Sequence, residues 1–368
     1  MKKILVTGGC GFIGRHVVSE LLENGYGVRV LDALIEQVHG DAETILPEEV
    51  DVVSGNVCDR AVVEKALADI DGVIHLAAEV GVGQSMYEIA RYVDANDLGT
   101  AVLLEAMIGK PIKRIVVASS MSVYGEGRYM DATGRDAGSI RRRADRVRAG
   151  LWEPLGADGS ALTPSPTDEQ KPVDLASIYA LTKYAQERQV LIFGEAYNME
   201  AVALRLFNVF GAGQALSNPY TGVLANFASR LANGQRPTVF EDGQQKRDFV
   251  HVEDVALAFR LALEKPDANS HVINIGSGNA YTITEVAGLL AEAMNVPHLE
   301  PEILNKSRAG DIRNCFADIS KARELLGFEP RHLLENSLQR FVQWVAQTRS
   351  VDRGNQMRKQ LEERGLVS

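Results

Sequence analysis

Cysteine, long apolar runs and net positive charge are all missing or scarce in this sequence, and each shortage excludes a class of protein. The three cysteines, Cys10, Cys58 and Cys315, lie too far apart for a disulfide framework or a cysteine-based metal site. We therefore expect them to pack as small apolar side chains and to remain reduced thiols, as in a reducing compartment. We also expect no bound metal. The net charge of −10 argues against a general binder of nucleic acid or of anionic membranes.

No apolar run approaches the roughly 20 residues that span a bilayer. Residues 1–9 have a basic start like that of a signal peptide, but the apolar part is short and leads directly into a glycine turn. We therefore expect a cytoplasmic protein. With 368 residues, of which 45% are hydrophobic and 24% charged, the chain can form two packed domains or one large α/β unit.

The beginning of the chain reads as strand, glycine turn, helix, strand and acid. Residues 3–7 and 28–31 are β-prone, and residues 15–22 have helical apolar periodicity. Asp32 follows the second strand, where a carboxylate accepts hydrogen bonds from an adenosine ribose. This arrangement predicts a dinucleotide site that favours NAD over its 2′-phosphorylated form.

The glycines of the turn have separate roles in such a site. Gly8 allows a tight turn, Gly11 lets the backbone approach a pyrophosphate at the helix N-terminus, and Gly14 lets the helix pack on the strand. The residues that we expect to hold the pyrophosphate are Gly8, Gly11, Phe12, Ile13 and Gly14.

Strands and helices continue to alternate. Residues 50–53, 72–76 and 113–119 read as strands, and residues 60–68 and 84–107 as helices. The pattern predicts an α/β fold with a Rossmann-type, doubly wound parallel sheet, whose ligands bind beyond the carboxyl ends of the strands. Further cofactor contacts are expected near these ends, from Asn56, Val57, Leu76, Ala77, Ala78, Asn96 and Ser119. His75, at a strand end, is expected to be a packed, hydrogen-bonded residue rather than a catalyst.

Tyr179 and Lys183 are one helical turn apart and lie on one face of a predicted helix. A free tyrosine, with a pKa of about 10, is a poor base near neutral pH. A neighbouring ammonium group favours the phenolate, so we expect Lys183 to lower the pKa of Tyr179. The pair could then remove a proton from a substrate hydroxyl, and both side chains are also expected to contact the cofactor.

These motifs occur in an order that resembles the extended short-chain dehydrogenase/reductases that modify nucleotide sugars. The segments that carry the resemblance are the glycine turn, the Tyr179 and Lys183 pair, and residues 75–78, 96–100, 119–125, 204–211, 247–255, 274–278 and 308–311. The resemblance implies that Ser120 orients the substrate oxygen and that Asn208, Arg247 and Arg308 hold the nucleotide-sugar phosphates. Guanidinium groups suit that task, although either arginine read alone is equally a surface ion-pair partner. We expect substrate contacts from Val80, Ser120, Met121, Ser122, Asn208, Val223, Arg247 and Arg308.

Two side chains after Ser120 indicate which reaction is performed. Relatives that eliminate water carry an Asp-Glu pair at these positions, and decarboxylating relatives usually keep the Glu. Here the positions hold Met121 and Ser122, neither of which is an acid or base near neutral pH. The sequence therefore favours an NAD-dependent nucleotide-sugar 4-epimerase. The alternatives are a 4,6-dehydratase, a uronic acid decarboxylase or a reductase on the same scaffold, and a non-catalytic NAD-binding regulatory protein.

An insertion at residues 126–171 separates the serine strand from Tyr179. Together with residues 33–40 and the C-terminal tail, it is similar to a subgroup known as dTDP-L-rhamnose 4-epimerases, which make 6-deoxy-L-talose. Relatives with this insertion often carry Cys and His in it, but residues 130–160 contain neither, so no zinc site is expected there. Its charged stretch, residues 140–148, is expected to be a solvated helical turn, with phosphate binding or a lid as the alternative.

We expect residues 1–207 and about 243–277 to form the NAD-binding domain, with residues 208–242 and 278–368 forming a smaller α/β nucleotide-sugar-binding domain. We expect a nucleotide sugar linked to dTDP, UDP or GDP, and the sequence does not decide among these nucleotides. The resemblance also implies a homodimer built from the helices at 84–107 and 178–193, although a buried core face would have the same apolar pattern. The amphipathic stretch 333–361 is expected to fold back on the body or to meet a partner subunit.

Overall fold

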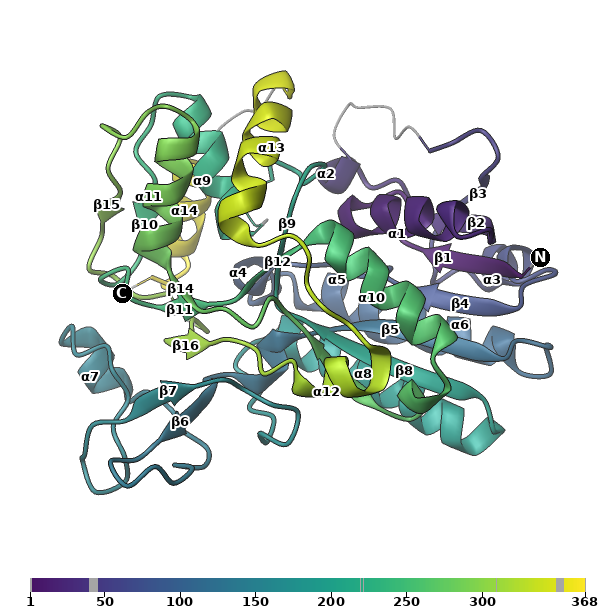
Figure 1. The fold of residues 1–368 in the computed structure, drawn as a ribbon, viewed down its shortest axis with the longest axis horizontal. Helices are drawn as coiled ribbons and strands as arrows, with labels where there is room; N and C mark the ends of the chain where they lie inside the picture. The colour runs from purple at the N-terminus through teal and green to yellow at the C-terminus, as the bar shows by residue number, and fades with distance from the viewer. Residues whose placement is uncertain are drawn as a thin grey trace.

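A sheet of seven parallel strands runs through the molecule in the order β13-β8-β5-β4-β1-β2-β3 (Figure 1). The computed structural model describes residues 2–39, 46–218, 220, 222–308, 310–348 and 354–367. The strands of the sheet are β1 (Lys3–Thr7), β2 (Gly27–Asp32), β3 (Asp51–Ser54), β4 (Gly72–His75), β5 (Arg114–Ser120), β8 (Glu200–Leu206) and β13 (Val272–Ile275). The strand order reverses at β1 and β4, which confirms the predicted Rossmann-type doubly wound sheet.

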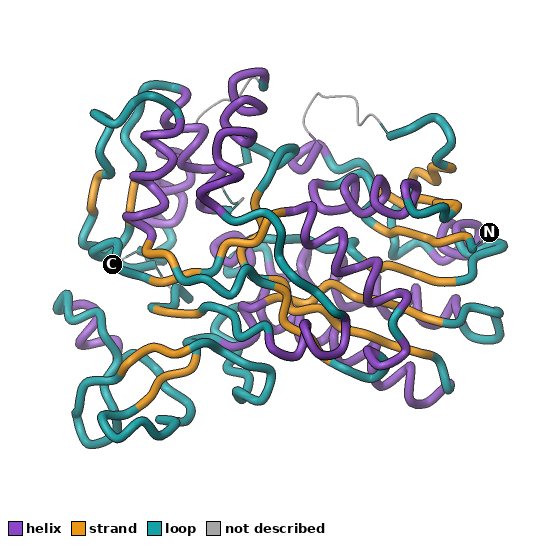
Figure 2. Tube along the Cα trace, in the orientation of Figure 1, coloured by secondary structure: helices purple, strands orange, loops and turns teal. Residues whose placement is uncertain are grey.

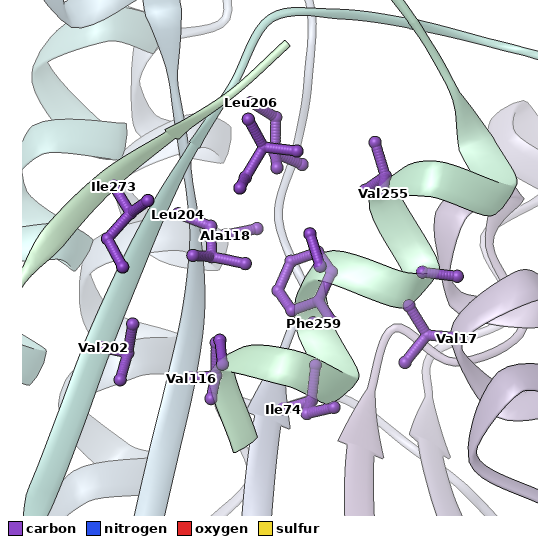
Figure 3. Close-up of a cluster of buried hydrophobic side chains, with 14 of the residues drawn as sticks. Val17, Ile74, Val116, Ala118, Val202, Leu204, Leu206, Val255, Phe259 and Ile273 are labelled. Carbon is purple, nitrogen blue, oxygen red and sulfur yellow. The ribbon is translucent and has the colours of Figure 1, made fainter. Parts of the chain in front are cut away.

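Helices cover both faces of the sheet (Figure 2). One layer consists of α1 (Phe12–Glu23), α10 (Val252–Glu264) and α12 (Ser320–Leu326), and the other of α3 (Arg60–Ala66), α6 (Gly99–Met107) and α8 (Ile178–Tyr197). Because side chains alternate along a strand, Ile4 and Val6 of β1 pack in the first layer and Leu5 in the second. In the first layer, Phe259 of α10 lies among side chains of the sheet (Figure 3).

A third apolar cluster lies outside the sheet, at the left of Figure 1. Its helices are α9 (Val223–Ala232), α11 (Ile283–Ala293) and α13 (Leu334–Gln347). Phe249 packs in this cluster although it falls within the 243–277 range that we predict for the cofactor domain. The division into two domains remains a prediction. It is supported by the separation of this third apolar cluster from the two that cover the sheet.

Several short strands connect the third cluster to the sheet. They form the pairs β9–β12 and β10–β15 and the three-stranded sheet β14-β11-β16. Their bounds are β9 (Asn208–Phe210), β10 (Thr238–Val239), β11 (Lys246–Arg247), β12 (Phe249–His251), β14 (Tyr281–Thr282), β15 (Glu302–Ile303) and β16 (Asn314–Cys315). The short helices outside the layers include α2 (Glu36–His39) and two 3₁₀ turns, Met121–Tyr124 and Pro266–Ala268. No helix among the described residues is long and apolar enough to cross a membrane.

The single helix predicted for residues 84–107 is wrong. The chain instead forms α4 (Val82–Ser85), α5 (Ile89–Tyr92), a π-helical turn (Val93–Leu98) and then α6. A Cβ atom at Gly99 would lie 2.5 Å from Val57 Cγ1, so close packing fixes the position of α6. Asn96 in the π turn binds the backbone of Glu79, which draws the preceding segment inward. Apolar periodicity does not reveal such a change of helical pitch.

The stretch predicted as amphipathic at residues 333–361 is also divided, into α13 and α14 (Gly354–Glu363). Residues 349–353, which we expected to resemble the tail of the subgroup, lie outside the described residues.

The insertion at residues 126–171 is a small folded unit at the lower left of Figure 1. It contains the antiparallel strands β6 (Arg128–Met130) and β7 (Thr163–Ser165) and the helix α7 (Ala144–Arg148). Backbone hydrogen bonds from Gly127 to Asn314 and from Thr167 to Phe316 join both of its ends to the segment around β16. Trp152 is buried in this unit.

Candidate active site

The glycine turn after β1 is shaped for a dinucleotide. Gly8 has φ +70°, and a Cβ there would lie 2.9 Å from the backbone nitrogen of Ala77. A Cβ on Gly14 would lie 2.2 Å from the Gly8 carbonyl oxygen, whereas one on Gly11 would meet only that oxygen, at 3.2 Å. The turn is thus packed on its inner side and open at Gly11. Gly11 is also the N-cap of α1 and supplies no side-chain cap, so the first N–H groups of the helix can bind an anion.

Asp32 lies at the end of β2, beside this turn. Its Oδ2 accepts a hydrogen bond from Cys10 N at 2.9 Å and its Oδ1 one from Leu34 N at 2.9 Å. These bonds fix the orientation of the carboxylate at the carboxyl end of β2, the place where an acid meets the ribose in a dinucleotide site. The residues that the sequence predicts for the NAD site are thus a backbone turn and Asp32, and their geometry fits the cofactor.

Asn96 and Ser119, which we predict to bind the cofactor, have protein partners in the structure. The buried Asn96 bonds to the backbone of Glu79 and donates to Thr182 Oγ1 at 2.9 Å. Ser119 Oγ donates to Glu187 Oε2 at 2.7 Å, and Glu187 is held by Arg205. Both side chains form hydrogen bonds between elements that surround the site. Their contact with NAD remains a prediction.

The other predicted cofactor residues occupy positions around the same edge of the sheet. Leu76, Ala77 and Ala78 follow β4 directly, while Asn56 and Val57 follow the end of β3. The Asn56 side chain accepts a hydrogen bond from Cys58 N at 2.9 Å and thereby shapes the turn, and Val57 is buried. Phe12 and Ile13 begin α1.

His75 is buried in a chain of polar side chains, as predicted. Its Nδ1 lies 2.7 Å from Thr7 Oγ1, and its Nε2 lies 2.9 Å from Thr100 Oγ1 and 3.2 Å from Gln186 Nε2. Burial lowers the pKa of His75 to about 3, so the imidazole is neutral near pH 7. Gln186, which the sequence analysis did not single out, connects this chain to Lys183.

Tyr179 lies in the first turn of α8, which begins at the side-chain cap Ser177. Its backbone N–H donates to Ser85 Oγ of α4 at 3.0 Å, and its side chain forms a hydrogen bond with Ser120 at the end of β5. Ser120 Oγ in turn accepts from Ser122 Oγ at 2.9 Å. The serine and the tyrosine are therefore brought together, as predicted, although 58 residues of chain lie between positions 120 and 179.

The expected effect of Lys183 on Tyr179 is not found in the structure. Burial raises the pKa of Tyr179, and its hydrogen bond with Ser120 is the interaction that lowers it. Burial also lowers the pKa of Lys183 to about 7, against the opposing attraction of Glu187 and Asp97. Lys183 Nζ donates to Gln186 Oε1 at 2.6 Å. The prediction that Lys183 lowers the pKa of Tyr179 therefore has to be corrected for this structure, because the ammonium group is directed to Gln186 and is itself desolvated.

A cavity of about 390 Å³ opens next to Tyr179 and Ser120, within the size range of small-molecule sites. The predicted substrate residues that line it are Ser120, Met121, Ser122, Asn208, Val223, Arg247 and Arg308. Val80 does not line the cavity and is 48% exposed, whereas its neighbours Gly81 and Val82 do line it. Lining residues that the sequence analysis did not assign to the substrate include Met86, Tyr220 and Gln245, together with side chains of α14.

Arg247 and Arg308 supply cationic groups to the wall of this cavity. The Arg247 guanidinium donates to the carbonyl oxygens of Ile312 at 2.6 Å and Arg313 at 2.9 Å. Arg308 binds both carboxylate oxygens of Asp311 and stacks on the ring of Phe240, 4.5 Å from its centroid. Both guanidinium groups are thus held in place, which suits the recognition of phosphate.

The side chains beside Ser120 supply no acid or base. Met121 is buried, with its sulfur 3.7 Å from Asn208 Nδ2, and Ser122 bonds to Ser120. The second proton-transfer group that elimination requires is therefore missing at the positions where dehydrating relatives carry it. The cavity can support transfer of a proton between a sugar hydroxyl and Tyr179.

The charged stretch at residues 140–148 is mostly solvated, as expected, but it contributes one buried guanidinium group, that of Arg142. Arg142 pairs with Glu126 at 2.9 Å and Glu241 at 2.6 Å, and donates to the carbonyl oxygen of Asp311 at 2.8 Å. The helix α7 at the end of this stretch has no buried residue, which agrees with the predicted solvated turn. The tip of the insertion is thus fixed to the segment whose Asp311 side chain binds Arg308.

One mixed group of side chains among the described residues has the composition of a metal site. His251, Glu253 and His332 have possible ligand atoms within 4.8 Å of one another. Glu253 is, however, paired with Arg340 at 2.6 Å, and His332 Nδ1 lies 2.9 Å from Asp254 Oδ1. Glu253 and His332 are thus already engaged by protein partners.

Comparison with known proteins agrees with this geometry. Residues 4–144 and 155–276 match the model of the NAD dependent epimerase/dehydratase family, and the chain belongs to that family. It is 36% identical to a dTDP-L-rhamnose 4-epimerase of Burkholderia thailandensis over 361 residues, which are 96% of this chain and 97% of the relative.

Solved structures with the same fold include two UDP-glucose 4-epimerases. The enzyme of Thermotoga maritima, in a structure with UDP-glucose, is 32% identical, with a TM-score of 0.76 over 94% of this chain and 99% of that one. The enzyme of Thermus thermophilus, in complex with NAD, is 29% identical, with a TM-score of 0.75 over the same shares of both chains. These findings confirm the predicted family, the NAD cofactor and the assignment as an NAD-dependent nucleotide-sugar epimerase.

Proposed function

We propose that the protein inverts C4 of dTDP-L-rhamnose to give dTDP-6-deoxy-L-talose. The observation that carries the choice of reaction is the pairing of Tyr179 with Ser120 in a cavity whose adjacent positions hold Met121 and Ser122. One proton-transfer group suits a reversible oxidation of a hydroxyl, whereas elimination requires an additional acid and base. The choice of sugar is supported by the B. thailandensis relative, which is named for that substrate and matches nearly the whole chain.

The residues of this chain perform the proton transfer and hold the sugar. Tyr179 accepts the proton from the C4 hydroxyl, and Ser120 donates a hydrogen bond to the same oxygen as its negative charge develops. NAD, when bound, supplies the hydride acceptor and then the hydride donor, and its positively charged ring favours the phenolate of Tyr179. The 4-keto sugar turns within the cavity while Arg247 and Arg308 hold the diphosphate. Because the turned sugar presents the opposite face of C4 to the cofactor site, the configuration at C4 is inverted when the ketone is reduced and Tyr179 returns the proton to O4.

Incubation of the purified protein with nucleotide sugars tests this proposal. The panel contains dTDP-L-rhamnose, UDP-glucose and GDP-mannose, and products are followed by NMR without added cofactor. We expect inversion at C4 of dTDP-L-rhamnose, since the cofactor is regenerated in each cycle. Loss of water or carbon dioxide, net reduction that depends on added NADH, or no turnover would each contradict the proposal and would support a dehydratase, a decarboxylase, a reductase or a non-catalytic protein, respectively.

We also propose that the protein is a homodimer that pairs through the α5 and α8 surface. Large apolar side chains are exposed there: Ile89 is 47% exposed, Val93 40%, Leu181 46% and Ile192 55%. A helical surface of this kind is suited to contact with a second copy. Sedimentation analysis of Leu181→Glu tests the proposal, and a dimer that is unchanged by this charge would overturn it.

A further inference from the structure

The C-terminal segment forms one wall of the cavity, although it is more than 170 residues away from Tyr179 along the chain. Met357, Arg358 and Leu361 of α14 line the cavity, and Leu366 lines it beyond the helix. Met357 and Leu361 are four residues apart, so they lie on one face of α14. Both are buried, whereas Lys359 on the same helix is largely exposed.

Leu361 is positioned at the end of the cavity near Tyr179. A Cβ on Gly83 would lie 3.5 Å from a methyl carbon of Leu361, so Leu361 rests on α4. The same short helix carries Ser85, whose Oγ accepts the hydrogen bond from the backbone of Tyr179. The apolar face of α14 is therefore near the part of the cavity where the sugar reacts.

The end of the segment lies near the phosphate-binding residues instead. Val367 forms an isolated β-bridge with Arg308, and Glu362 pairs with Lys306 at 3.1 Å. The segment thus packs on α4 at Leu361 and on the Arg308 segment at Glu362 and Val367. A nucleotide sugar bound with its diphosphate on Arg308 would present its sugar to Met357 and Leu361.

Polar contacts hold the segment to the rest of the protein. Gln360 Oε1 accepts from Tyr220 Oη at 2.8 Å, and Tyr220 Oη lies 2.6 Å from Tyr87 Oη. The Arg364 guanidinium lies over the Tyr87 ring, 4.3 Å from its centroid. Since Tyr87 follows α4 and Tyr220 precedes α9, the segment is attached to both sides of the cavity.

We propose that Met357 and Leu361 form a selectivity wall for a nucleotide-linked 6-deoxyhexose. The C6 methyl group of such a sugar packs favourably against apolar side chains, because this removes apolar surface from water. A hexose has a hydroxyl at C6, which loses its water partners against the same wall and gains no hydrogen bond from it. Val82 and Met86 continue the apolar lining on the α4 side. The one charged lining group of α14, Arg358, faces Glu362 at 3.9 Å. This inference rests on the proposed function, because it assigns the sugar class of the same site.

Calorimetry with three ligands tests the wall on the full-length protein with its NAD. The ligands are dTDP, dTDP-L-rhamnose and dTDP-L-mannose, and the two sugars differ only by the hydroxyl at C6. We expect wild type to bind the 6-deoxy sugar at least tenfold more tightly than its hydroxylated analogue. Met357→Gln and Leu361→Asn should each reduce this ratio severalfold and leave the affinity for dTDP unchanged, since the nucleotide does not reach the wall.

Lys359→Gln, on the exposed side of α14, is the matched control and should keep the wild-type ratio. The affinity for dTDP also reports whether each variant is folded. An unchanged ratio in both wall variants would overturn the inference, and so would an equal loss of affinity for dTDP and for both sugars. If wild type discriminates at C6 as expected but shows no inversion of dTDP-L-rhamnose, the wall stands and the proposed reaction fails. If inversion occurs without discrimination at C6, the proposed reaction stands and the wall fails.

Discussion

The predicted cofactor site and the cavity beside Tyr179 are built in different ways. The cofactor pocket is formed by short turns at the ends of parallel strands, such as the glycine turn after β1 and Asp32 at the end of β2. The substrate cavity is lined by side chains from α4, α9, β11, the Arg308 segment and α14, which are distant in sequence. The first depends on local backbone geometry, and the second depends on contacts that form only when the chain is folded.

This difference predicts how the cofactor site and the substrate cavity each respond to the substitution of a side chain. A parallel sheet positions all of its carboxyl ends at once, so the cofactor pocket should survive the loss of one side chain. The substrate cavity depends on individual ion pairs, among them the bonds of Arg142 to Glu126 and Glu241. Four substitutions test this contrast, in order of decreasing expected effect.

Tyr179→Phe, at the junction of the two halves, removes the proton-transfer group without changing the packing. We expect the rate of sugar inversion to fall by roughly 10³-fold, because general acid–base catalysis contributes effects of this order. Bound NAD should remain at the wild-type level, since the glycine turn and Asp32 are unchanged. NMR measures the rate, and absorbance of cofactor released on denaturation measures the NAD content. Near-normal turnover would exclude Tyr179 as the base, and loss of NAD would contradict the independence of the cofactor pocket.

Arg142→Met should destabilise the substrate side of the molecule. It leaves two buried carboxylates, Glu126 and Glu241, without one of their cationic partners, and breaking a buried pair costs about 3–5 kcal/mol of unfolding free energy. Urea titration with tryptophan fluorescence measures the change, because Trp152 is buried in the insertion. Arg141→Ala is the control, since Arg141 is exposed and pairs with Asp174 at the surface. Equal unfolding curves for the two variants would show that the buried network does not stabilise this region.

Arg247→Leu should weaken binding of dTDP and of dTDP-L-rhamnose about equally, by roughly 10- to 100-fold. A hydrogen bond to a charged group contributes about 1.5–3 kcal/mol, and each 1.4 kcal/mol corresponds to a factor of ten in affinity. We expect KM to rise with little change in kcat, because the proposed role of Arg247 is to hold the phosphates before and after the chemical step. Lys246→Gln, at a neighbouring position that does not line the cavity, is the comparison. A fall in kcat at constant KM would place Arg247 in the chemical step instead.

His75→Gln tests how far the buried imidazole at the end of β4 makes the free energy of unfolding depend on pH. Burial holds the pKa of His75 at about 3, below its ordinary value of 6.5, so the folded state binds fewer protons than the unfolded state between these values. The stabilising contribution is complete above pH 6.5 and is lost as the pH falls toward 3, with a slope of up to about 1.4 kcal/mol per pH unit. Urea titrations at pH 5 and pH 7 should show a smaller difference for the variant than for wild type. An identical difference would mean that other groups cause the acid sensitivity.

Much of the cofactor half could be predicted from the sequence because its signals are local. The glycine turn, Asp32 and the alternation of strands and helices occur within short stretches, and backbone sterics fix what each can form. The pairing of Ser120 with Tyr179 could also be predicted, since both follow from the family resemblance. The single helix at residues 84–107 was wrong, because the Val57–Gly99 and Asn96–Glu79 contacts that interrupt it lie across the fold.

The pKa values and ion pairs in and around the site depend on which side chains are buried. Burial follows from the folded structure and not from residue type. Residue types alone suggested that Lys183 lowers the pKa of Tyr179 and that Arg142 is solvated. The fold instead directs Lys183 to Gln186 and encloses Arg142 among carboxylates.

The sequence by itself determined the parallel sheet, the NAD pocket and the side chains available for proton transfer, because strand periodicity, glycine sterics and residue chemistry act locally. Only the tertiary structure decided what lines the cavity beside Tyr179. It placed α14 against α4 and fixed the insertion beside Arg308, through contacts between segments that no sequence spacing connects. The walls of the cavity are therefore a product of packing, whereas the chemistry at its centre can be read from the chain.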